Sequence, residues 1–161
     1  MAAYYLDSSA LVKRYAAEVG TFWVRTITSP DASHVLFVAL IAGAEVVAAV
    51  AKRERTGSLS ATDAQQAISD FQNHFRAQYN VIAFTRDIVE RAMALAPRLS
   101  LRGYDAVQLV TALTVNDELT RSGSTAITFV SADSYLNTAA AREGLRAEDP
   151  QVHPNPLDPK P

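Results

Sequence analysis

The chain of 161 residues contains no cysteine and only three histidines. Without cysteine, disulfide bonds and thiolate metal sites are excluded. The histidines, His34, His74 and His153, are scattered along the chain and lack the spacing of a zinc site. The metal sites that are commonly built from cysteine and histidine are therefore not expected in this protein.

Long hydrophobic runs are also scarce. The most apolar stretch, residues 35–51, is 17 residues long, which is the lower limit for a membrane span, and it carries Glu45 in its interior. We therefore expect a buried segment and no contact with a membrane. The N-terminus lacks the basic and then apolar pattern of a signal peptide. Together with the absence of cysteine, this favours a cytoplasmic protein.

Composition and charge are ordinary. Apolar residues make up 48% of the chain and charged residues 20%, as in soluble globular proteins. The length fits one domain with a hydrophobic core. A net charge of −2 argues against a nucleic-acid partner, unless the acidic residues are concentrated in one place.

Short apolar segments alternate with amphipathic ones, which predicts an α/β domain with a mostly parallel sheet flanked by helices. Five of the seven prolines follow Glu148. We therefore expect a domain over residues 1–148 and a proline-rich tail over residues 149–161 that is extended or disordered. Strands are predicted at residues 3–6, 33–38, 80–84 and 126–131, and helices at residues 9–17, 20–27, over the apolar stretch that ends near 57, and at 60–78, 85–97, 104–115 and 133–144.

Four acidic residues occupy positions that are unusual for surface carboxylates. Asp7 follows the first strand, Glu45 lies inside an apolar helix, and Asp105 and Asp133 begin helices. Taken singly, the three aspartates are explained as helix caps, and Asp105 has capping-box spacing with Gln108. Because ligands bind at the carboxyl ends of parallel strands, Asp7 and Asp133 should meet at one edge. Several carboxylates in one place repel each other unless a cation neutralises them, and oxygen ligands favour Mg²⁺ or Mn²⁺.

The segments around these acids are YYLDSSALVKRY, GAEVVAAVAKRERTG, LRGYDAVQLVTAL and FVSADSYLNTAAAREGL. They resemble the four acidic motifs of the PIN-domain ribonucleases and, more narrowly, of the VapC-type toxins of toxin–antitoxin pairs. The likeness extends from Ala3 to about Pro150. It implies a PIN-like fold in which four acids are both catalytic and metal-binding, two serines support them, and Gln108 stands where many relatives have histidine. The implied site consists of Asp7, Glu45, Asp105 and Asp133, supported by Ser9 and Ser131.

The resemblance also implies a function. The expected protein is a toxin that hydrolyses RNA phosphodiesters with Mg²⁺ or Mn²⁺, forms a homodimer and is bound by a small antitoxin protein. If four acids form a metal pocket, 13 of the 17 acidic residues remain against 15 basic ones, so the rest of the molecule is mildly basic. Lys13 and Arg14, together with Lys52, Arg53 and Arg55, are candidates for RNA phosphate contacts. Solvated helix faces explain these basic residues equally well.

The alternative from a different class is a non-catalytic PIN-like module that binds RNA or a protein. Such a module would bind RNA regardless of chelation or of the substitution Asp7→Asn. A haloacid-dehalogenase-like phosphatase is disfavoured because it needs a second aspartate two residues after the first, where this chain has Ser9. A serine hydrolase is disfavoured because Ser8 and Ser9 lack a G-x-S-x-G context.

Overall fold

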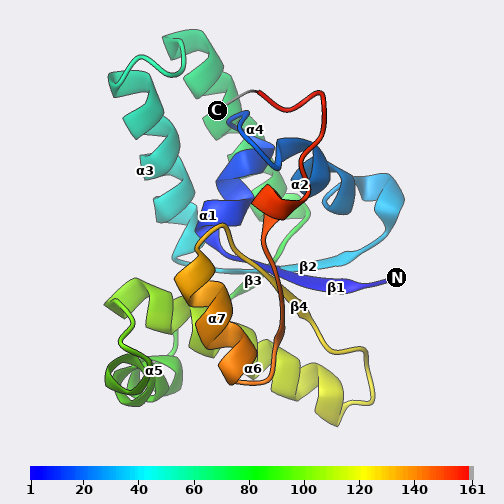
Figure 1. Cartoon of the computed structure of the whole chain (residues 1–161), viewed down its shortest axis with the longest axis vertical. Helices are drawn as coiled ribbons and strands as arrows, with labels where there is room; N and C mark the ends of the chain where they lie inside the picture. Colours follow the sequence, from blue (N-terminus) through cyan, green and yellow to red (C-terminus); the bar gives the residue numbers. More distant parts are fainter. Residues whose placement is uncertain (160–161) are drawn as a thin grey trace.

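A five-stranded sheet forms the centre of the computed structural model, which describes residues 1–159. All strand pairs are parallel, and the order is β3-β2-β1-β4-β5. Helices cover both faces of the sheet (Figure 1). The predicted α/β fold with a parallel sheet is therefore confirmed. The strands are β1 (Ala3–Leu6), β2 (Val35–Ala39), β3 (Asn80–Ile82), β4 (Thr128–Val130) and β5 (Arg146–Glu148).

The side chains of the central strands divide the hydrophobic core in two, because successive residues of a strand point to opposite faces. Tyr5 of β1 and Phe129 of β4 point to one face, where their rings stack with centroids 5.7 Å apart. Leu6 and Val130, the next residues in each strand, belong to the other half of the core. The result is a layer of helices on each side of the sheet.

Each helix belongs to one of these two layers according to its position in the chain. The layer with Tyr5 and Phe129 comes from the C-terminal half of the chain, and the layer with Leu6 and Val130 from the N-terminal half. The first layer contains α5 (Arg86–Leu99), α6 (Gly103–Arg121) and α7 (Ser134–Arg142), and the second contains α1 (Ser8–Leu11), α2 (Thr21–Ile27), α3 (Ala42–Arg55) and α4 (Ala61–Ala77), with short 3-10 helices at Val12–Arg14 and Pro30–Ala32.

Three predicted helices have different bounds in the structure. The helix expected over residues 9–17 ends as an α-helix at Leu11 and continues only as the 3-10 helix Val12–Arg14. Helix α5 runs through Pro97 to Leu99, so the proline that was predicted to close the helix lies within its last turn. Helix α6 continues to Arg121, well beyond the apolar segment from which it was predicted.

The strand β5 has no counterpart in the sequence-based prediction. It is three residues long, lies at the edge of the sheet and pairs with β4. Its sequence, Arg-Ala-Glu, lacks the apolar run that marks a buried strand, because an edge strand is held mainly by its backbone hydrogen bonds. Residues of this kind are not recognisable as a strand without the neighbouring strand.

The proline-rich tail lies against α2, whereas an extended or disordered segment was predicted. Pro150–Val152 form a 3-10 helix, and the ring of His153 stacks on Trp23 with centroids 4.4 Å apart. The carboxylate of Asp158 accepts a hydrogen bond from the backbone N–H of Gly20 at 3.0 Å. The tail is seen beside α2 in Figure 1. Residues 160 and 161 of the predicted tail lie outside the described residues, and the domain boundary at residue 148 stays a prediction.

The apolar stretch at residues 35–51 is split between β2 and the first part of α3. Within residues 1–159, the structure contains no helix with the length and apolar character needed to cross a bilayer.

Candidate active site

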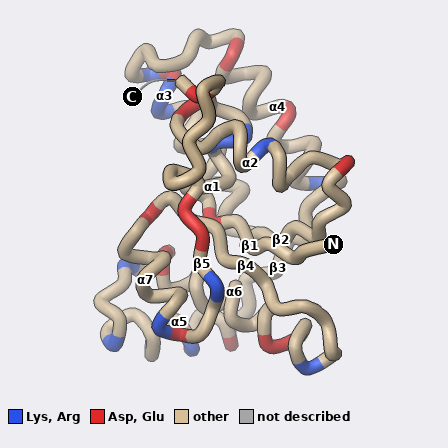
Figure 2. Tube along the Cα trace, turned by 45° about the vertical axis from the view of Figure 1, so that its right-hand side comes forward, with Lys and Arg blue, Asp and Glu red and all other residues tan. Residues whose placement is uncertain are grey.

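The carboxyl ends of β1 and β4 mark the place where the strand order of the sheet reverses. From β1 the chain continues to β2 on one side, whereas β4 occupies the other side. The backbone N–H of Asp7, just after β1, donates to the carbonyl of Val130, the last residue of β4, at 2.9 Å. Acidic positions lie here in the middle of the molecule as well as on the outer helices (Figure 2). Such a reversal point is the usual ligand site of an open parallel sheet.

Asp7 is buried, with 4% of its surface exposed, and three hydrogen bonds end on one of its oxygens. Oδ2 accepts from the backbone N–H of Ser9 at 3.2 Å, from the Ser9 hydroxyl at 2.6 Å and from the Ser131 hydroxyl at 3.1 Å. Burial raises the pKa of the Asp7 carboxyl, and the hydrogen bonds from the two serines oppose this shift. Asp7 is also the N-cap of α1, so the capping explanation holds alongside the predicted contacts with Ser9 and Ser131.

Glu45 lies in the first turn of α3 and is held by Gln108 of α6. The Gln108 amide donates to Glu45 Oε2 at 2.8 Å, and its own oxygen accepts from the hydroxyl of Tyr5 at 2.7 Å. Burial is the main cause that raises the pKa of Glu45, and the negative charges of Asp7 and Asp105 raise it further. Because these charges act on Glu45, the three carboxylates share one electrostatic environment.

Gln108 is therefore a residue of the site to which the sequence analysis assigned no catalytic part. It is buried, and it connects the core hydroxyl of Tyr5 to the carboxylate of Glu45. The signal for its position is present in the sequence, because a spacing of three residues places Asp105 and Gln108 on the same side of a helix. The spacing alone does not reveal Glu45 as its partner, since Glu45 belongs to a different helix.

Asp105 and Asp133 are joined by a cation that the sequence analysis also missed. Arg102 Nε lies 3.1 Å from Asp105 Oδ2, and an Arg102 terminal nitrogen lies 3.7 Å from Asp133 Oδ2. The other oxygen of Asp133 accepts from the backbone N–H groups of Tyr135 and Leu136, so Asp133 is the N-cap of α7. The Arg102 side chain is 84% exposed, so solvent weakens both ion pairs.

The four predicted acids thus lie around the same end of the sheet. Neutral side chains hold Asp7 and Glu45, whereas Arg102 lies between Asp105 and Asp133. Within the described part of the chain, no three acidic or histidine side chains are close enough together to hold a metal ion. The donors are all carboxylates, which suits a hard cation such as Mg²⁺ or Mn²⁺. The negative charges of Asp7 and Asp105 raise the pKa of Glu45, and Arg102 lies between the other two carboxylates.

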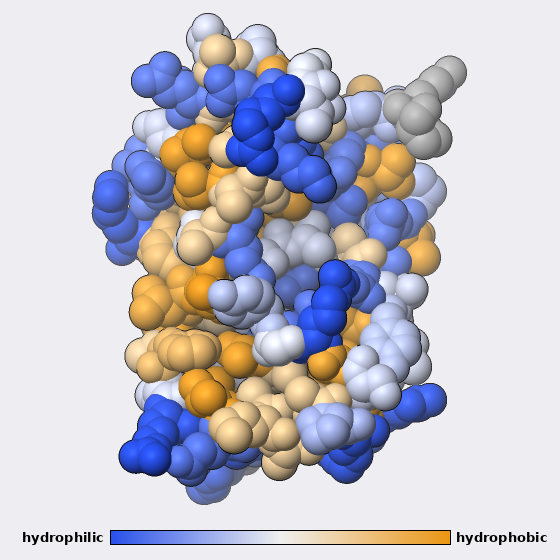
Figure 3. Space-filling model, turned by 90° about the vertical axis from the view of Figure 1, so that its left-hand side faces the viewer, coloured by the Kyte–Doolittle hydropathy of each residue, from blue (hydrophilic) through white to orange (hydrophobic). Residues whose placement is uncertain are grey.

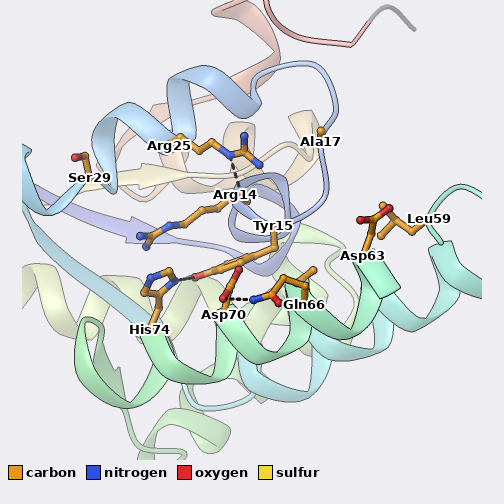
Figure 4. Close-up of a pocket in the computed structure, with 11 residues that line it drawn as sticks. Arg14, Tyr15, Ala17, Arg25, Ser29, Leu59, Asp63, Gln66, Asp70 and His74 are labelled. Atoms are coloured by element: carbon orange, nitrogen blue, oxygen red, sulfur yellow. Dashed lines mark hydrogen bonds between the residues drawn. The ribbon is translucent and has the colours of Figure 1, made fainter. Parts of the chain in front are cut away.

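Lys13 and Arg14, two of the five predicted RNA-contacting residues, line different cavities. Lys13 lines a cleft of about 340 Å³ that also contains Ser9 and Glu45. Arg14 lines a separate cavity of about 570 Å³ that α4 borders, where Figure 4 shows it beside Tyr15. Its guanidinium donates to the hydroxyl of Tyr79 at 2.6 Å and is therefore engaged within the protein. A role of Arg14 in RNA binding stays a prediction.

Comparison with known proteins identifies the family. The family model described as PIN domain matches residues 4–140. The chain belongs to the PIN-domain family. This PIN domain is 29% identical over 150 residues to Ribonuclease VapC45 of Mycobacterium tuberculosis strain CDC 1551 / Oshkosh and to Ribonuclease VapC49 of strain ATCC 25618 / H37Rv. Both alignments cover 93% of this chain and 97% of the relative, so the predicted resemblance to VapC-type PIN ribonucleases is confirmed.

A solved structure gives the same result for the fold of this PIN domain. The crystal structure of PAE2754 from Pyrobaculum aerophilum matches it with a TM-score of 0.57. The match covers 94% of this chain and 92% of that chain, at 18% sequence identity. At this identity, the likeness concerns the fold.

Replacing Gln108 by leucine should destabilise this PIN domain, because the hydroxyl of Tyr5 and the carboxylate of Glu45 would lose a common partner. A buried polar group left without its hydrogen bond costs about 1–3 kcal/mol. We expect a loss of this size in the free energy of unfolding, measured by urea denaturation of the Gln108→Leu variant. The variant Tyr5→Phe with Gln108→Leu should recover part of the loss, because the unpaired hydroxyl is then absent. If the costs of the two single substitutions simply add, the proposed connection is contradicted.

Proposed function

We propose that this protein is an endoribonuclease that hydrolyses RNA phosphodiesters with Mg²⁺ or Mn²⁺ bound by Asp7, Glu45, Asp105 and Asp133. The observation that carries the proposal is the position of these carboxylates around the carboxyl ends of β1 and β4 in a PIN-domain chain. The relatives that match over nearly their full length are named ribonucleases, which supports the same activity.

In this proposal, neutral hydrogen-bond partners orient three of the four acids toward the ion. When bound, the divalent ion would supply Lewis-acid activation of the scissile phosphate and of the attacking water. Ser9 and Ser131 hold Asp7 through one oxygen and so fix its orientation. Gln108 does the same for Glu45 through Oε2, and the cap of α7 fixes Asp133 through Oδ1. The protein thus orients its ligands by hydrogen bonds before an ion or an RNA strand arrives.

A non-catalytic PIN-like binding module is the competing proposal. All four acids are present, and separate hydrogen bonds hold Asp7, Glu45 and Asp133. Helix capping also accounts for the bonds of Asp7 and Asp133, so it is the contact between Gln108 and Glu45 that favours the enzyme.

We also propose that the protein acts as a cytoplasmic toxin and that its antitoxin uses the groove between α5 and α6. This groove of about 440 Å³ has a mostly apolar lining that includes Met93 and Tyr104, which are 70% and 61% exposed. It also includes Arg102, the partner of Asp105. An antitoxin helix with its apolar side in this groove would bring an arginine close to the carboxylates, and a guanidinium can bind two carboxylate oxygens at once.

A homodimer is the third part of the proposal. Leu40 and Phe84 follow the neighbouring strands β2 and β3 and are 50% and 52% exposed. The side of the molecule that carries α3 and α5 shows hydrophobic side chains between charged ones (Figure 3). Exposed apolar groups of this size favour burial against a second chain.

Light scattering after size-exclusion chromatography tests both the homodimer and the complex with the antitoxin. We expect twice the chain mass of 17.4 kDa for the protein alone, and a larger complex after co-expression with the small protein encoded beside it. Co-expression should also relieve growth arrest. A monomer, or equal arrest in the presence of every adjacent reading frame, would contradict the respective partner.

The purified protein should cleave RNA in the presence of Mg²⁺ or Mn²⁺, and EDTA should stop the reaction. Asp7→Asn should lower the rate by about a thousandfold or more, because a ligand of the catalytic ion is lost. The matched control is Asp31→Asn, which removes an exposed carboxylate and should leave the rate unchanged. Undiminished cleavage by Asp7→Asn would point to a contaminating nuclease, whereas RNA binding without cleavage by the wild type would favour the binding module.

Thermal unfolding in EDTA tests the metal site without relying on activity. Burial raises the pKa of Asp7 above the ordinary value of 3.8, so its ionised form lowers the stability of the metal-free protein. This penalty is complete above the raised pKa and disappears as the pH falls to 3.8. All three hydrogen bonds end on Oδ2, which an asparagine carbonyl oxygen can replace. Asp7→Asn should therefore melt no lower than wild type at pH 7, and any advantage should shrink in acid.

Adding Mg²⁺ completes the same experiment. A ligand that binds only the folded state raises the melting temperature by mass action. Millimolar Mg²⁺ should therefore stabilise the wild type and barely affect Asp7→Asn. An Asp7 that serves only as a helix cap would give a small loss of stability on mutation and no dependence on the ion. An identical response of both proteins to Mg²⁺ would remove the physical basis of the shared site.

A further inference from the structure

A cleft next to the acids contains positive charge that the proposed chemistry does not use. Its volume of about 340 Å³ falls in the range of ligand sites, about 300–1,000 Å³. One wall is formed by Glu45, Ala49 and Arg53 of α3, which are spaced four residues apart and therefore lie on one side of the helix. Lys13 lines the same cleft. The cleft thus connects a proposed catalytic carboxylate with two cations.

Glu18 fixes both cations in this cleft. Its Oε1 lies 3.2 Å from Lys13 Nζ, and its Oε2 lies 3.1 Å from a terminal nitrogen of Arg53. Lys13 is 5% exposed and also donates to the carbonyl of Val19 at 3.0 Å. Arg53 is 28% exposed and donates to the carbonyl of Ala49 at 3.2 Å. The cluster of Lys13, Arg53 and Glu18 thus carries one net positive charge in a fixed position, and the carboxylate of Glu45 lines the same cleft.

The distance along α3 separates this charge from the catalytic centre. Glu45 and Arg53 are eight residues apart, about 12 Å along the helix axis, and the Arg53 guanidinium reaches back to the carbonyl of Ala49, which lies one turn from Glu45. A phosphate beside Arg53 would therefore lie about one helical turn from the carboxylate of Glu45. Because both residues line one cleft, a single RNA strand can reach from one to the other.

We propose that Arg53 and Lys13 form a subsite for an RNA phosphate that neighbours the one being cleaved, and that this phosphate competes with Glu18 for the two cations. Arg53, the more exposed cation, contacts the phosphate, and the buried Lys13 adds positive charge without touching it. This proposal rests on the proposed function, because it requires an RNA strand across the acids. It assigns no RNA contact to Lys52 or Arg55, which are exposed on the same helix and do not line the cleft.

Binding of a short fluorescent oligouridylate, measured by anisotropy in EDTA, tests the subsite. All variants carry Asp7→Asn, so that the RNA stays intact. Each phosphate contact on a single strand contributes about 0.7 to the slope of log affinity against log salt. Arg53→Gln should therefore reduce the magnitude of the slope by about 0.7. Since 0.1 M and 1 M salt differ tenfold, the loss of affinity relative to Asp7→Asn alone should be about fivefold larger at 0.1 M than at 1 M. The matched controls Lys52→Gln and Arg55→Gln should keep the slope.

Glu18→Gln separates the subsite from a purely structural ion cluster. The substitution removes an anion that competes with RNA, so RNA binding should become tighter. A cluster that only fastens the chain around Glu18 to α3 would show a lower melting temperature with no gain in binding. Equal salt slopes for Arg53→Gln and Arg55→Gln would overturn the subsite, whether or not the wild type cuts RNA. A lower slope for Arg53→Gln together with a wild type that cuts no RNA supports the subsite and refutes the nuclease.

Discussion

The hydroxyl groups of Ser9 and Ser131 meet on one oxygen of Asp7, and the arrangement of the site depends on this contact. Ser131 is 124 residues away from Asp7 in the chain, so the contact exists only because β4 lies beside β1 in the sheet. Burying a carboxylate is unfavourable, and these hydrogen bonds compensate part of the cost. Glu45 depends in the same way on Gln108, so each of these two carboxylates has its own neutral partner.

Helix capping and the proposed metal site use the same residues without conflict. Asp133 uses Oδ1 to cap α7 and leaves Oδ2 to face Arg102, while Asp7 caps α1 through Oδ2 alone. In both residues the capping bonds fix one carboxylate oxygen, and this sets the direction of the other oxygen. The sequence analysis explained the single aspartates as helix caps. This explanation is correct for Asp7 and Asp133, and it is compatible with a functional site.

The sequence predicted the parts of the fold that bury apolar side chains. Strands β1 to β4 follow apolar runs, and the motifs around the acids indicated the PIN-domain family. It did not reveal β5, which is charged and held by backbone pairing, or the docking of the tail through Asp158. The role of Gln108 was also missed, because its partners belong to other elements, whereas Arg102 was missed although Asp105 follows three residues later. Interactions between distant segments have no local pattern, and this explains why β5, the docking of the tail and the role of Gln108 were missed.

The position of β4 next to β1 also determines when the site can form during synthesis. Strands β1, β2 and β3 are adjacent in the sheet and consecutive in the chain, so they can pair while the rest is still being made. Asp7 and Glu45 therefore leave the ribosome early. Ser131 and Asp133 follow only after most of the domain, and until then Asp7 lacks both the Val130 carbonyl and the Ser131 hydroxyl. A growing chain thus carries Asp7 and Glu45 before the residues that complete the site, Ser131 and Asp133, have been added.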